Sequence, residues 1–435
     1  MIPHARLIGV ALALAAVGIP VIWLPALAPA WSVLAAAAAI VAAVDALVCR
    51  GIAVPTIERK TPGSLSLGNW STIRLLLQND HAFTRLRLRV FDHYPPEFRF
   101  RDLPQELAIE KRHFAELAYE VCPAERGLFE FPGCELLLRS PLGLWWRRRK
   151  VPLRTAIRVY PNYSTIAKLL MHEADNPLST SGVRLRRRRG QGTEFEQLRD
   201  YRDGDPLRSI DWKATARLSR LISREYQDER DQQVVFLLDT GRRMLAKDAQ
   251  LSHFDHALNA MILLSYVALR HGDAVGIMTA GAERRWLPPR KGMQSVNALL
   301  NHVYDVQPQP IEIDYIAAAT ELSVKQRRRS LIVILTNIRE EDSDDLRSSM
   351  LLLRRRHLVI LASLRERALD ETIQRPLRRF RDALDYASTD LYLESRRASQ
   401  DILRASGVLV EDCLCEELPA AITNQYLAVK RAGAL

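Results

Sequence analysis

The stretch VVFLLDTGRRM, residues 234–244, decides the fold class of the C-terminal half of the chain. Five apolar residues run without a polar break to Asp239, which is typical of a strand buried on both faces of a parallel sheet. The Asp239 carboxylate would then lie at the carboxyl end of its strand, where open α/β sheets bind their ligands. Arg242 and Arg243 follow at once, and a metal site does not favour neighbouring positive charge. The stretch predicts an α/β fold and raises the question of whether Asp239 binds a metal.

Strands and helices alternate from residue 231 to residue 435, which predicts a doubly wound, mostly parallel sheet. Further strands are predicted at 273–281, 283–288, 330–337, 357–364 and 407–413. Helices are predicted at 254–272, 293–306, 315–326 and 344–356, in a stretch after 364 and from Glu417 onward. The helix at 254–272 is expected to bury one apolar face, formed by Phe254, Leu258, Met261, Ile262, Ser265 and Leu269.

Residues 1–50 predict two transmembrane helices, at about 7–24 and 31–49. No charged side chain occurs from Leu7 to Val44, and the stretch is too long for one crossing of a bilayer. Prolines between Trp23 and Trp31 break the helix there. Basic residues at both outer ends place both termini, and with them the large soluble part, on the cytoplasmic side of the membrane. A signal peptide cleaved near residues 26–30 is the alternative, and the second apolar segment would then remain as the anchor.

Residues 51–160 contain short, partly alternating apolar runs separated by Pro, Gly, Asn and Asp, which predict a β-sandwich-like domain. Near its end, Trp145 and Trp146 precede Arg147, Arg148 and Arg149. These three arginines are candidate contacts for anionic lipid or a protein partner. A half-buried Trp145 with the arginines in solvent is the alternative.

Residues 161–230 form a connector that is densely charged in both signs, with a helix expected at about Ser164 to Ala174. Its acidic residues are expected to pair with neighbouring Lys and Arg rather than to bind a cation. Five residues are expected to anchor it to a domain: Phe195, Leu198, Tyr201, Ile210 and Trp212. The basic run Arg186, Arg187, Arg188 and Arg189 is a further candidate for contact with a partner or with lipid.

The composition is that of a globular protein with a basic balance, 62 Lys and Arg against 51 Asp and Glu, which favours an acidic partner or surface. Five cysteines are spread from Cys49 to Cys415, which indicates a reducing compartment rather than a disulfide framework. No phosphate-binding loop, dinucleotide-binding turn or HExxH motif occurs, and no catalytic nucleophile can be named. We therefore expect neither a cofactor nor an enzyme.

The order of these features resembles a bacterial family, the domain of unknown function fifty-eight. The resemblance is carried by SPLGL at 140–144, VYPN at 159–162, the motif GTEFEQLRDYRDGDPLRSIDWKATARLSRLISREY at 192–226, and VVFLLD at 234–239. It implies that residues 231–435 form a von Willebrand factor A-like domain. It also implies association with MoxR-type AAA+ ATPases, which act on envelope or complex-assembly clients.

In von Willebrand factor A domains, an Asp-x-Ser-x-Ser turn, a threonine from a later loop and an aspartate after the fourth strand hold Mg²⁺. Here the corresponding positions are Asp239, Gly241, Arg243 and Asn337, and Asp314 lies near the position expected for the threonine. Mg²⁺ prefers carboxylate and hydroxyl oxygens, and most of these ligands are missing. We therefore expect a vestigial site without Mg²⁺, in which the guanidinium of Arg243 or Arg242 lies near Asp239 and offsets its charge. An Asp239 that only caps the following helix is the alternative.

These observations together predict a membrane-anchored, cytoplasm-facing scaffold or adaptor that works with a MoxR-type ATPase or its client. The alternative is a protein that binds nucleic acid or anionic lipid. Nucleic acid is the less favoured partner, because the basic runs lie on different elements and the positive-inside bias of membrane proteins accounts for part of the excess. An unrecognised hydrolase is a third alternative.

Overall fold

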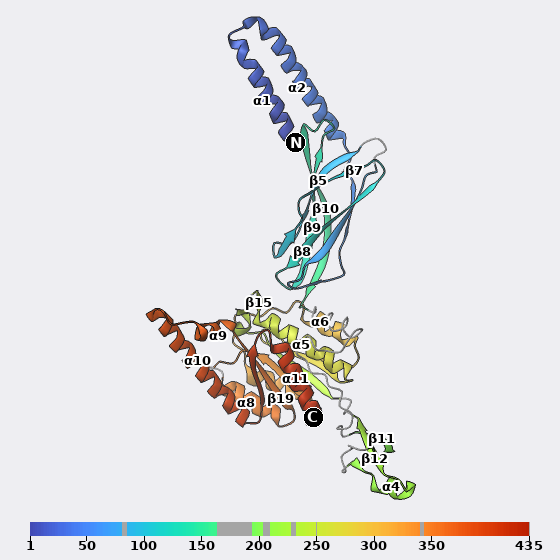
Figure 1. The fold of residues 1–435 in the computed structure, drawn as a ribbon, viewed down its shortest axis with the longest axis vertical. Helices are drawn as coiled ribbons and strands as arrows, with labels where there is room; N and C mark the ends of the chain where they lie inside the picture. Colours follow the sequence, from blue (N-terminus) through green and yellow to red (C-terminus); the bar gives the residue numbers. More distant parts are fainter. Residues whose placement is uncertain are drawn as a thin grey trace. The chain divides into compact units, whose positions relative to one another are not determined.

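The computed structural model describes residues 1–80, 85–162, 194–202, 209–227, 232–248, 250–339 and 343–434 (Figure 1). The chain divides into two compact units, Met1–Tyr160 and Pro161–Leu435. The first contains an apolar helical hairpin and two mainly antiparallel sheets, and the second contains a mixed sheet covered by helices.

The hairpin consists of α1 (Ala5–Gly18) and α2 (Ala28–Gly51), joined through the short 3₁₀ helices η1 (Ile19–Ile22) and η2 (Pro25–Leu27). By length and composition, the segments Ala5–Ile22 and Ala28–Gly51 can each cross a membrane. The Trp31 indole donates a hydrogen bond to the Leu14 carbonyl oxygen at 3.0 Å. Gly18 permits this approach, because a Cβ there would lie 3.0 Å from Trp31 Nε1. The two helices that the sequence predicts are present, with α2 starting three residues earlier than expected.

The two sheets of the first unit face each other (Figure 1), and apolar side chains from both sheets, such as Leu75 and Leu136, are fully buried, as the predicted sandwich requires. The larger sheet has the order β1-β10-β9-β5-β7, and β3 also pairs with β10. Its strands are β1 (Ile2–Pro3), β3 (Leu65–Ser66), β5 (Leu86–His93), β7 (Gln105–Ile109), β9 (Gly127–Arg139) and β10 (Trp145–Tyr160). The smaller sheet has the order β2-β4-β8-β6, made of β2 (Thr56–Lys60), β4 (Ser71–Gln78), β6 (Phe98–Arg101) and β8 (Phe114–Pro123).

The end of α2 is joined to the larger sheet by polar contacts. The buried Asp45 carboxylate accepts hydrogen bonds from the backbone N–H groups of Leu142 (3.0 Å) and Leu144 (3.3 Å). The Trp145 indole donates to the Ala42 carbonyl oxygen at 2.9 Å. Arg147 Nη1 donates to the carbonyl oxygens of Cys49 (3.1 Å), Arg50 (2.5 Å) and Ile52 (2.8 Å). These carbonyls are the unpaired acceptors at a helix C-terminus, so Arg147 caps α2.

Within the connector, the structure describes a β-hairpin of β11 (Glu194–Asp200) and β12 (Ile222–Gln227), with α4 (Trp212–Leu218) between its strands. Asp211 caps α4, accepting from the Ala214 N–H at 2.9 Å. Of the expected anchors, Ile210 is buried and Tyr201 is half-buried. The expectation was wrong for Leu198 and Trp212, which are 45% and 67% exposed, because the side chains of Leu198 on β11 and Trp212 at the start of α4 lie in solvent. The helix expected at 164–174 lies outside the described residues.

The second unit contains a six-stranded sheet with the order β17-β16-β13-β18-β19-β20, parallel except for the edge strand β17. Its strands are β13 (Gln233–Asp239), β16 (Ala274–Ala280), β17 (Trp286–Arg290), β18 (Leu331–Thr336), β19 (Leu358–Arg365) and β20 (Leu409–Leu414). One face packs against α5 (His253–Arg270), α6 (Ser295–Val303) and α11 (Leu418–Arg431). The other packs against α7 (Tyr315–Lys325), α8 (Ser343–Arg354) and α10 (Phe380–Ala405). The predicted doubly wound arrangement is present (Figure 1).

Helix α5 differs from its prediction, because nearly all of its sides are buried rather than one face. His253, His256 and Tyr266 are buried as well as the predicted apolar residues. The reason is that α11 packs along α5, so the helix lies between the sheet and a second helix. The spacing of apolar residues predicts which face of a helix is buried against the sheet, but it does not show that α11 covers the other side of α5.

Candidate functional site

The carboxyl ends of β13 and β18 bring Asp239 and Thr336 together. The Thr336 hydroxyl donates to Asp239 Oδ2 at 2.6 Å, and the Tyr315 hydroxyl, from the start of α7, donates to the same oxygen at 2.8 Å. The Gly241 N–H donates to Oδ1 at 2.7 Å. The Asp239 carboxyl is therefore held by three neutral donors.

Burial dominates the electrostatics of Asp239, which is 2% exposed. Burial raises the pKa of the Asp239 carboxyl above its usual value, while hydrogen bonds from Thr336, Gly241 and Tyr315 and the charge of Arg243 oppose this shift. Arg243 is thus the nearby cation, whereas Arg242 forms an ion pair with Glu312 at 2.9 Å. The sequence already indicated Thr336 at a functional strand end beside Asp239, but it did not reveal that Tyr315 also donates to the carboxyl.

The positions that correspond to metal ligands do not suit Mg²⁺. A Cβ at Gly241 would lie 2.7 Å from Ile313 Cγ1 and 2.9 Å from the Ile311 carbonyl oxygen, so a serine cannot be accommodated there without movement of the backbone. The cavity beside Asp239 has a volume of about 10 Å³. That is about the space for a single water, and an octahedral ion usually keeps several. Asp314 lies outside this cluster and caps α7, accepting from the Ala317 N–H at 2.8 Å.

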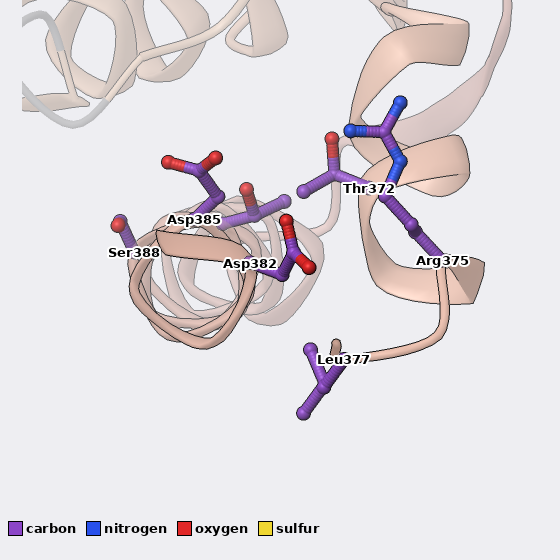
Figure 2. Close-up of a pocket in the computed structure, with 7 residues that line it drawn as sticks. Thr372, Arg375, Leu377, Asp382, Asp385 and Ser388 are labelled. Atoms are coloured by element: carbon purple, nitrogen blue, oxygen red, sulfur yellow. The ribbon is translucent and has the colours of Figure 1, made fainter. Parts of the chain in front are cut away.

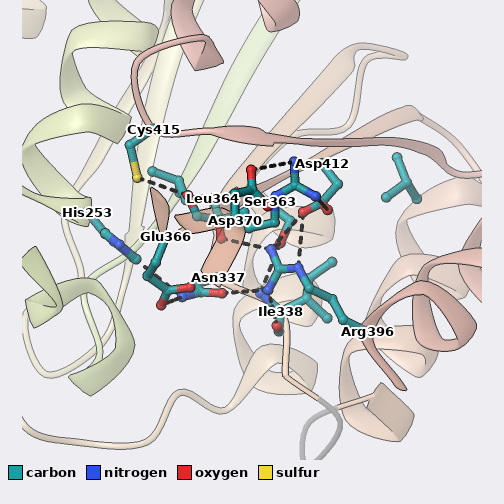
Figure 3. Close-up of polar contacts among 12 residues, drawn as sticks. His253, Asn337, Ile338, Ser363, Leu364, Glu366, Asp370, Arg396, Asp412 and Cys415 are labelled. Carbon is teal, nitrogen blue, oxygen red and sulfur yellow. Dashed lines mark hydrogen bonds and ion pairs between the residues drawn. The ribbon is translucent and has the colours of Figure 1, made fainter. Parts of the chain in front are cut away.

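Asn337 belongs to a second polar cluster at the same edge of the sheet (Figure 3). Its Nδ2 donates to Glu366 Oε1 at 3.0 Å, and its Oδ1 accepts from Arg396 Nη1 at 2.9 Å. The buried Arg396 side chain also donates to Asp412 Oδ1 at 2.7 Å and Ser363 Oγ at 2.5 Å. The residues expected in one vestigial metal site therefore separate into two clusters.

The cysteine and histidine beside this second cluster do not form a reactive pair. Cys415 donates to the Arg365 carbonyl oxygen at 3.7 Å, and burial raises the pKa of the Cys415 thiol to about 12. His253 is fully buried, and burial lowers the pKa of its ring. A protonated thiol is a poor nucleophile. Among the described residues, no group of three or more His, Cys, Asp or Glu side chains is arranged to hold a metal.

The full-length protein is therefore expected to bind Mg²⁺ and Mn²⁺ no more tightly than a dissociation constant of about 1 mM. The reason is the missing hydroxyl ligands and the small space beside Asp239. Titration calorimetry in detergent would measure this, with the Asp239→Ala variant as control. Micromolar binding that disappears in the variant would show that the site holds a metal.

A larger cavity, of about 330 Å³, lies between α9 (Arg367–Gln374) and the first turns of α10 (Figure 2). Its lining combines charged, hydroxyl and apolar groups, from Thr372, Arg375, Leu377, Asp382, Asp385, Ser388 and Thr389. The Asp382 carboxylate also caps α10, accepting from the Arg379 N–H at 2.9 Å. Sequence reasoning did not select any of these residues.

The candidate basic contacts differ in their surroundings. Arg147 caps α2, as described above, and Arg148 pairs with Glu135 at 2.6 Å. Arg149 is exposed. Arg186, Arg187, Arg188 and Arg189 lie outside the described residues.

The family described as "Protein of unknown function DUF58" matches residues 197–391. The uncharacterized protein YeaD of Bacillus subtilis is 23% identical over 189 residues, which cover 43% of this chain and 44% of YeaD. The uncharacterized protein Rv1480 of Mycobacterium tuberculosis is 26% identical over 143 residues, covering 32% of this chain and 45% of Rv1480. The chain thus spans less than half the length of these relatives.

Two solved structures show only a weak likeness. An aerotolerance-related membrane protein from Bacteroides fragilis has a TM-score of 0.24 at 20% identity, covering 30% of this chain and 67% of that protein. The RO (RSR) protein of Deinococcus radiodurans has a TM-score of 0.21 at 14% identity, covering 31% and 27%. These scores support no comparison of folds. The specific match is therefore the one over residues 197–391, where this part of the chain is similar to the DUF58 family of proteins of unknown function.

Proposed function

We propose that this protein is a membrane-anchored scaffold whose von Willebrand factor A-like unit faces the cytoplasm and docks a MoxR-type AAA+ ATPase or its client. The ATPase comes from the family resemblance. The observation that carries a docking role is the outer face of α10, which presents a line of exposed apolar side chains.

The apolar line on α10 consists of Phe380, Leu384, Leu391 and Ile402. Their spacings of 4, 7 and 11 residues place them on one side of the helix. They are 87%, 58%, 69% and 50% exposed. The opposite side of the same helix carries Leu393, Arg396 and Leu403, which are buried against the unit. A surface helix normally has one apolar face, so a second one indicates a protein partner.

The charges beside this face indicate the charge that its partner carries. Asp390 and Glu394 flank one side of the apolar line, and the cavity next to it is lined by Asp382 and Asp385 beside Arg375. Complementary interfaces place opposite charge on the two partners. We therefore expect the partner to present an apolar helix face or groove with Lys or Arg at its edge.

The anchor also supports a scaffold. Asp45, Trp145 and Arg147 fix the end of α2 to the larger sheet through the contacts given above. The β sandwich and the apolar hairpin are thus one body rather than two parts on a loose tether. A partner that binds this chain would be held at the membrane.

The Leu384→Ser/Leu391→Ser double variant is expected to recover at least about tenfold less ATPase than the wild type. Each buried leucine contributes about 1.5–3 kcal/mol, and 1.4 kcal/mol corresponds to a factor of ten in binding. The measurement is co-purification of a MoxR-type ATPase with tagged full-length protein after mild crosslinking, in cells that express both.

The Leu128→Ser/Leu142→Ser double variant is the matched control, because these leucines are 62% and 55% exposed on the β sandwich. It should recover as much ATPase as the wild type. Equal losses in both double variants would remove α10 as the docking face. Failure of the wild type to enrich the ATPase would contradict the scaffold proposal itself.

A further inference from the structure

Two arginines face each other on the outer surface of the larger sheet without an acid between them. The β5–β9 register begins with Leu88 opposite Leu138, so Arg87 and Arg139 are the next facing pair. Trp146 of β10 lies opposite Arg139 on the other side. Paired residues share a face of the sheet, and like charges directly opposite one another are destabilising. A negatively charged group bound between the two arginines would relieve this repulsion.

The arginines two residues before and two residues after Arg87 each form an ion pair with an acid. Arg85 pairs with Glu110 at 3.0 Å, and Arg89 Nε donates to Glu106 Oε1 at 2.9 Å. Arg87 lies between them on the same strand, and its partner across β7 is Ala108. Glu106 and Glu110 therefore compensate the arginines on either side of Arg87, and the Arg87–Arg139 pair keeps a positive charge.

Arg139 is the innermost of these cations. Its Nε is buried and makes no hydrogen bond within the part of the chain that the structure describes. The guanidinium packs over Gly143, where a Cβ would lie 2.7 Å from Nε. Burial, followed by the charges of Arg6 and Arg87, lowers the pKa of the Arg139 side chain, and the charge of Glu106 opposes this shift only in part. Arg6 is thus the third cation of the group.

The backbone around Arg6 is held against the same sheet. The strand β1 pairs with β10, placing Ile2 opposite Trp146. His4 Nδ1 accepts from the Arg6 N–H at 3.1 Å, and the His4 ring lies 5.5 Å from the Trp146 ring, measured between centroids. Arg6 lies in the first turn of α1, so the three cations gather where the first apolar helix begins.

We propose that Arg6, Arg87 and Arg139 form a binding site for a phosphate group, which is either the phosphodiester of an anionic lipid headgroup or inorganic phosphate. Guanidinium groups donate two parallel hydrogen bonds to phosphate oxygens, and a phosphate would supply the missing negative charge. The position at the start of an apolar helix is the level at which lipid headgroups lie. The site is separate from the proposed docking face on α10.

The test uses full-length protein in a nonionic detergent. Binding of phosphatidylglycerol and of phosphatidylcholine is measured by native mass spectrometry. Inorganic phosphate is tested by the shift in melting temperature relative to chloride at equal ionic strength. The Arg87→Ser/Arg139→Ser variant is expected to bind the phosphate source at least about tenfold more weakly. The Arg139→Lys variant keeps the charge but loses the two-pronged donor, so an intermediate loss is expected.

The Arg74→Ser/Arg154→Ser variant is the matched control, because it removes two positive charges from exposed ion pairs elsewhere in the same unit. If Arg87→Ser/Arg139→Ser loses binding of phosphatidylglycerol but not of phosphatidylcholine, the site binds a lipid headgroup. Selective loss of the stabilisation by inorganic phosphate supports a site for the free anion. Equal binding by both double variants, or equal losses in both, would overturn the proposal. Melting temperatures in chloride show whether each variant is folded. If the Arg87→Ser/Arg139→Ser variant does not fold, the phosphate binding of Arg139→Lys tests the proposal instead.

Discussion

Replacing Arg396 by methionine is expected to lower the free energy of unfolding of the α/β unit by about 3–5 kcal/mol. The Arg396 side chain is 2% exposed and pairs with Asp412 at 2.7 Å. It also donates to the carbonyl oxygens of Ile338 (2.7 Å) and Leu364 (2.8 Å), in the loop after β18 and in β19 (Figure 3). Methionine fills similar volume but supplies no donor. The variant therefore leaves two backbone carbonyls without this donor, and leaves the Asp412 carboxylate with only Arg365, at 4.0 Å, as its cation.

Hydrogen exchange of the β18, β19 and β20 amides in the full-length protein would measure this loss, because core strands report the global stability of their unit. The adjacent Arg397→Met is the control, since Arg397 is exposed and its replacement should change stability by no more than about 0.5 kcal/mol. If Arg396→Met exchanges as slowly as the wild type, Arg396 does not hold these strand ends together.

The second large effect is expected in the β sandwich. Arg59→Met should destabilise that unit by about 3–5 kcal/mol, because it leaves Asp92 buried without its cation. Both side chains are fully buried, and Arg59 donates to Asp92 through Nε at 2.9 Å and Nη2 at 2.5 Å. Tyr119 donates to the same carboxylate at 2.5 Å. Burial and the Asp92 charge raise the pKa of Tyr119 well above its usual range, which keeps the hydroxyl a donor.

Exchange of the β4, β5 and β9 amides would measure the effect of Arg59→Met. Arg154→Met, at an exposed ion pair on β10, is the control and should leave exchange unchanged. The Arg59→Met/Asp92→Leu variant tests the cause, because it removes both charges and should regain most of the lost stability. A double variant no more stable than Arg59→Met would indicate that packing, rather than the uncompensated carboxylate, accounts for the loss.

The order and type of the main elements can be predicted from the amino-acid pattern of each segment. Uninterrupted apolar runs ending at Asp239 and Thr336 predict strands buried on both faces, because only a parallel sheet covered by helices hides both sides. The charge-free stretch from Leu7 to Val44 predicts the hairpin, because no polar side chain can remain unpaired in lipid. Both predictions depend only on the periodicity and composition of one segment, and these can be read without knowing what the segment packs against.

For the candidate site, the sequence located Asp239 at a strand end and showed that the hydroxyl ligands were missing. Only the tertiary structure supplied its partners Tyr315 and Thr336, which are 76 and 97 residues away along the chain. It also assigned Arg147 to the end of α2, and brought Arg396 to the strand ends from within a charged run on α10. Arginine side chains in such runs look alike in sequence. Which of them becomes buried depends on strand order and helix packing, which bring distant acceptors to the same place.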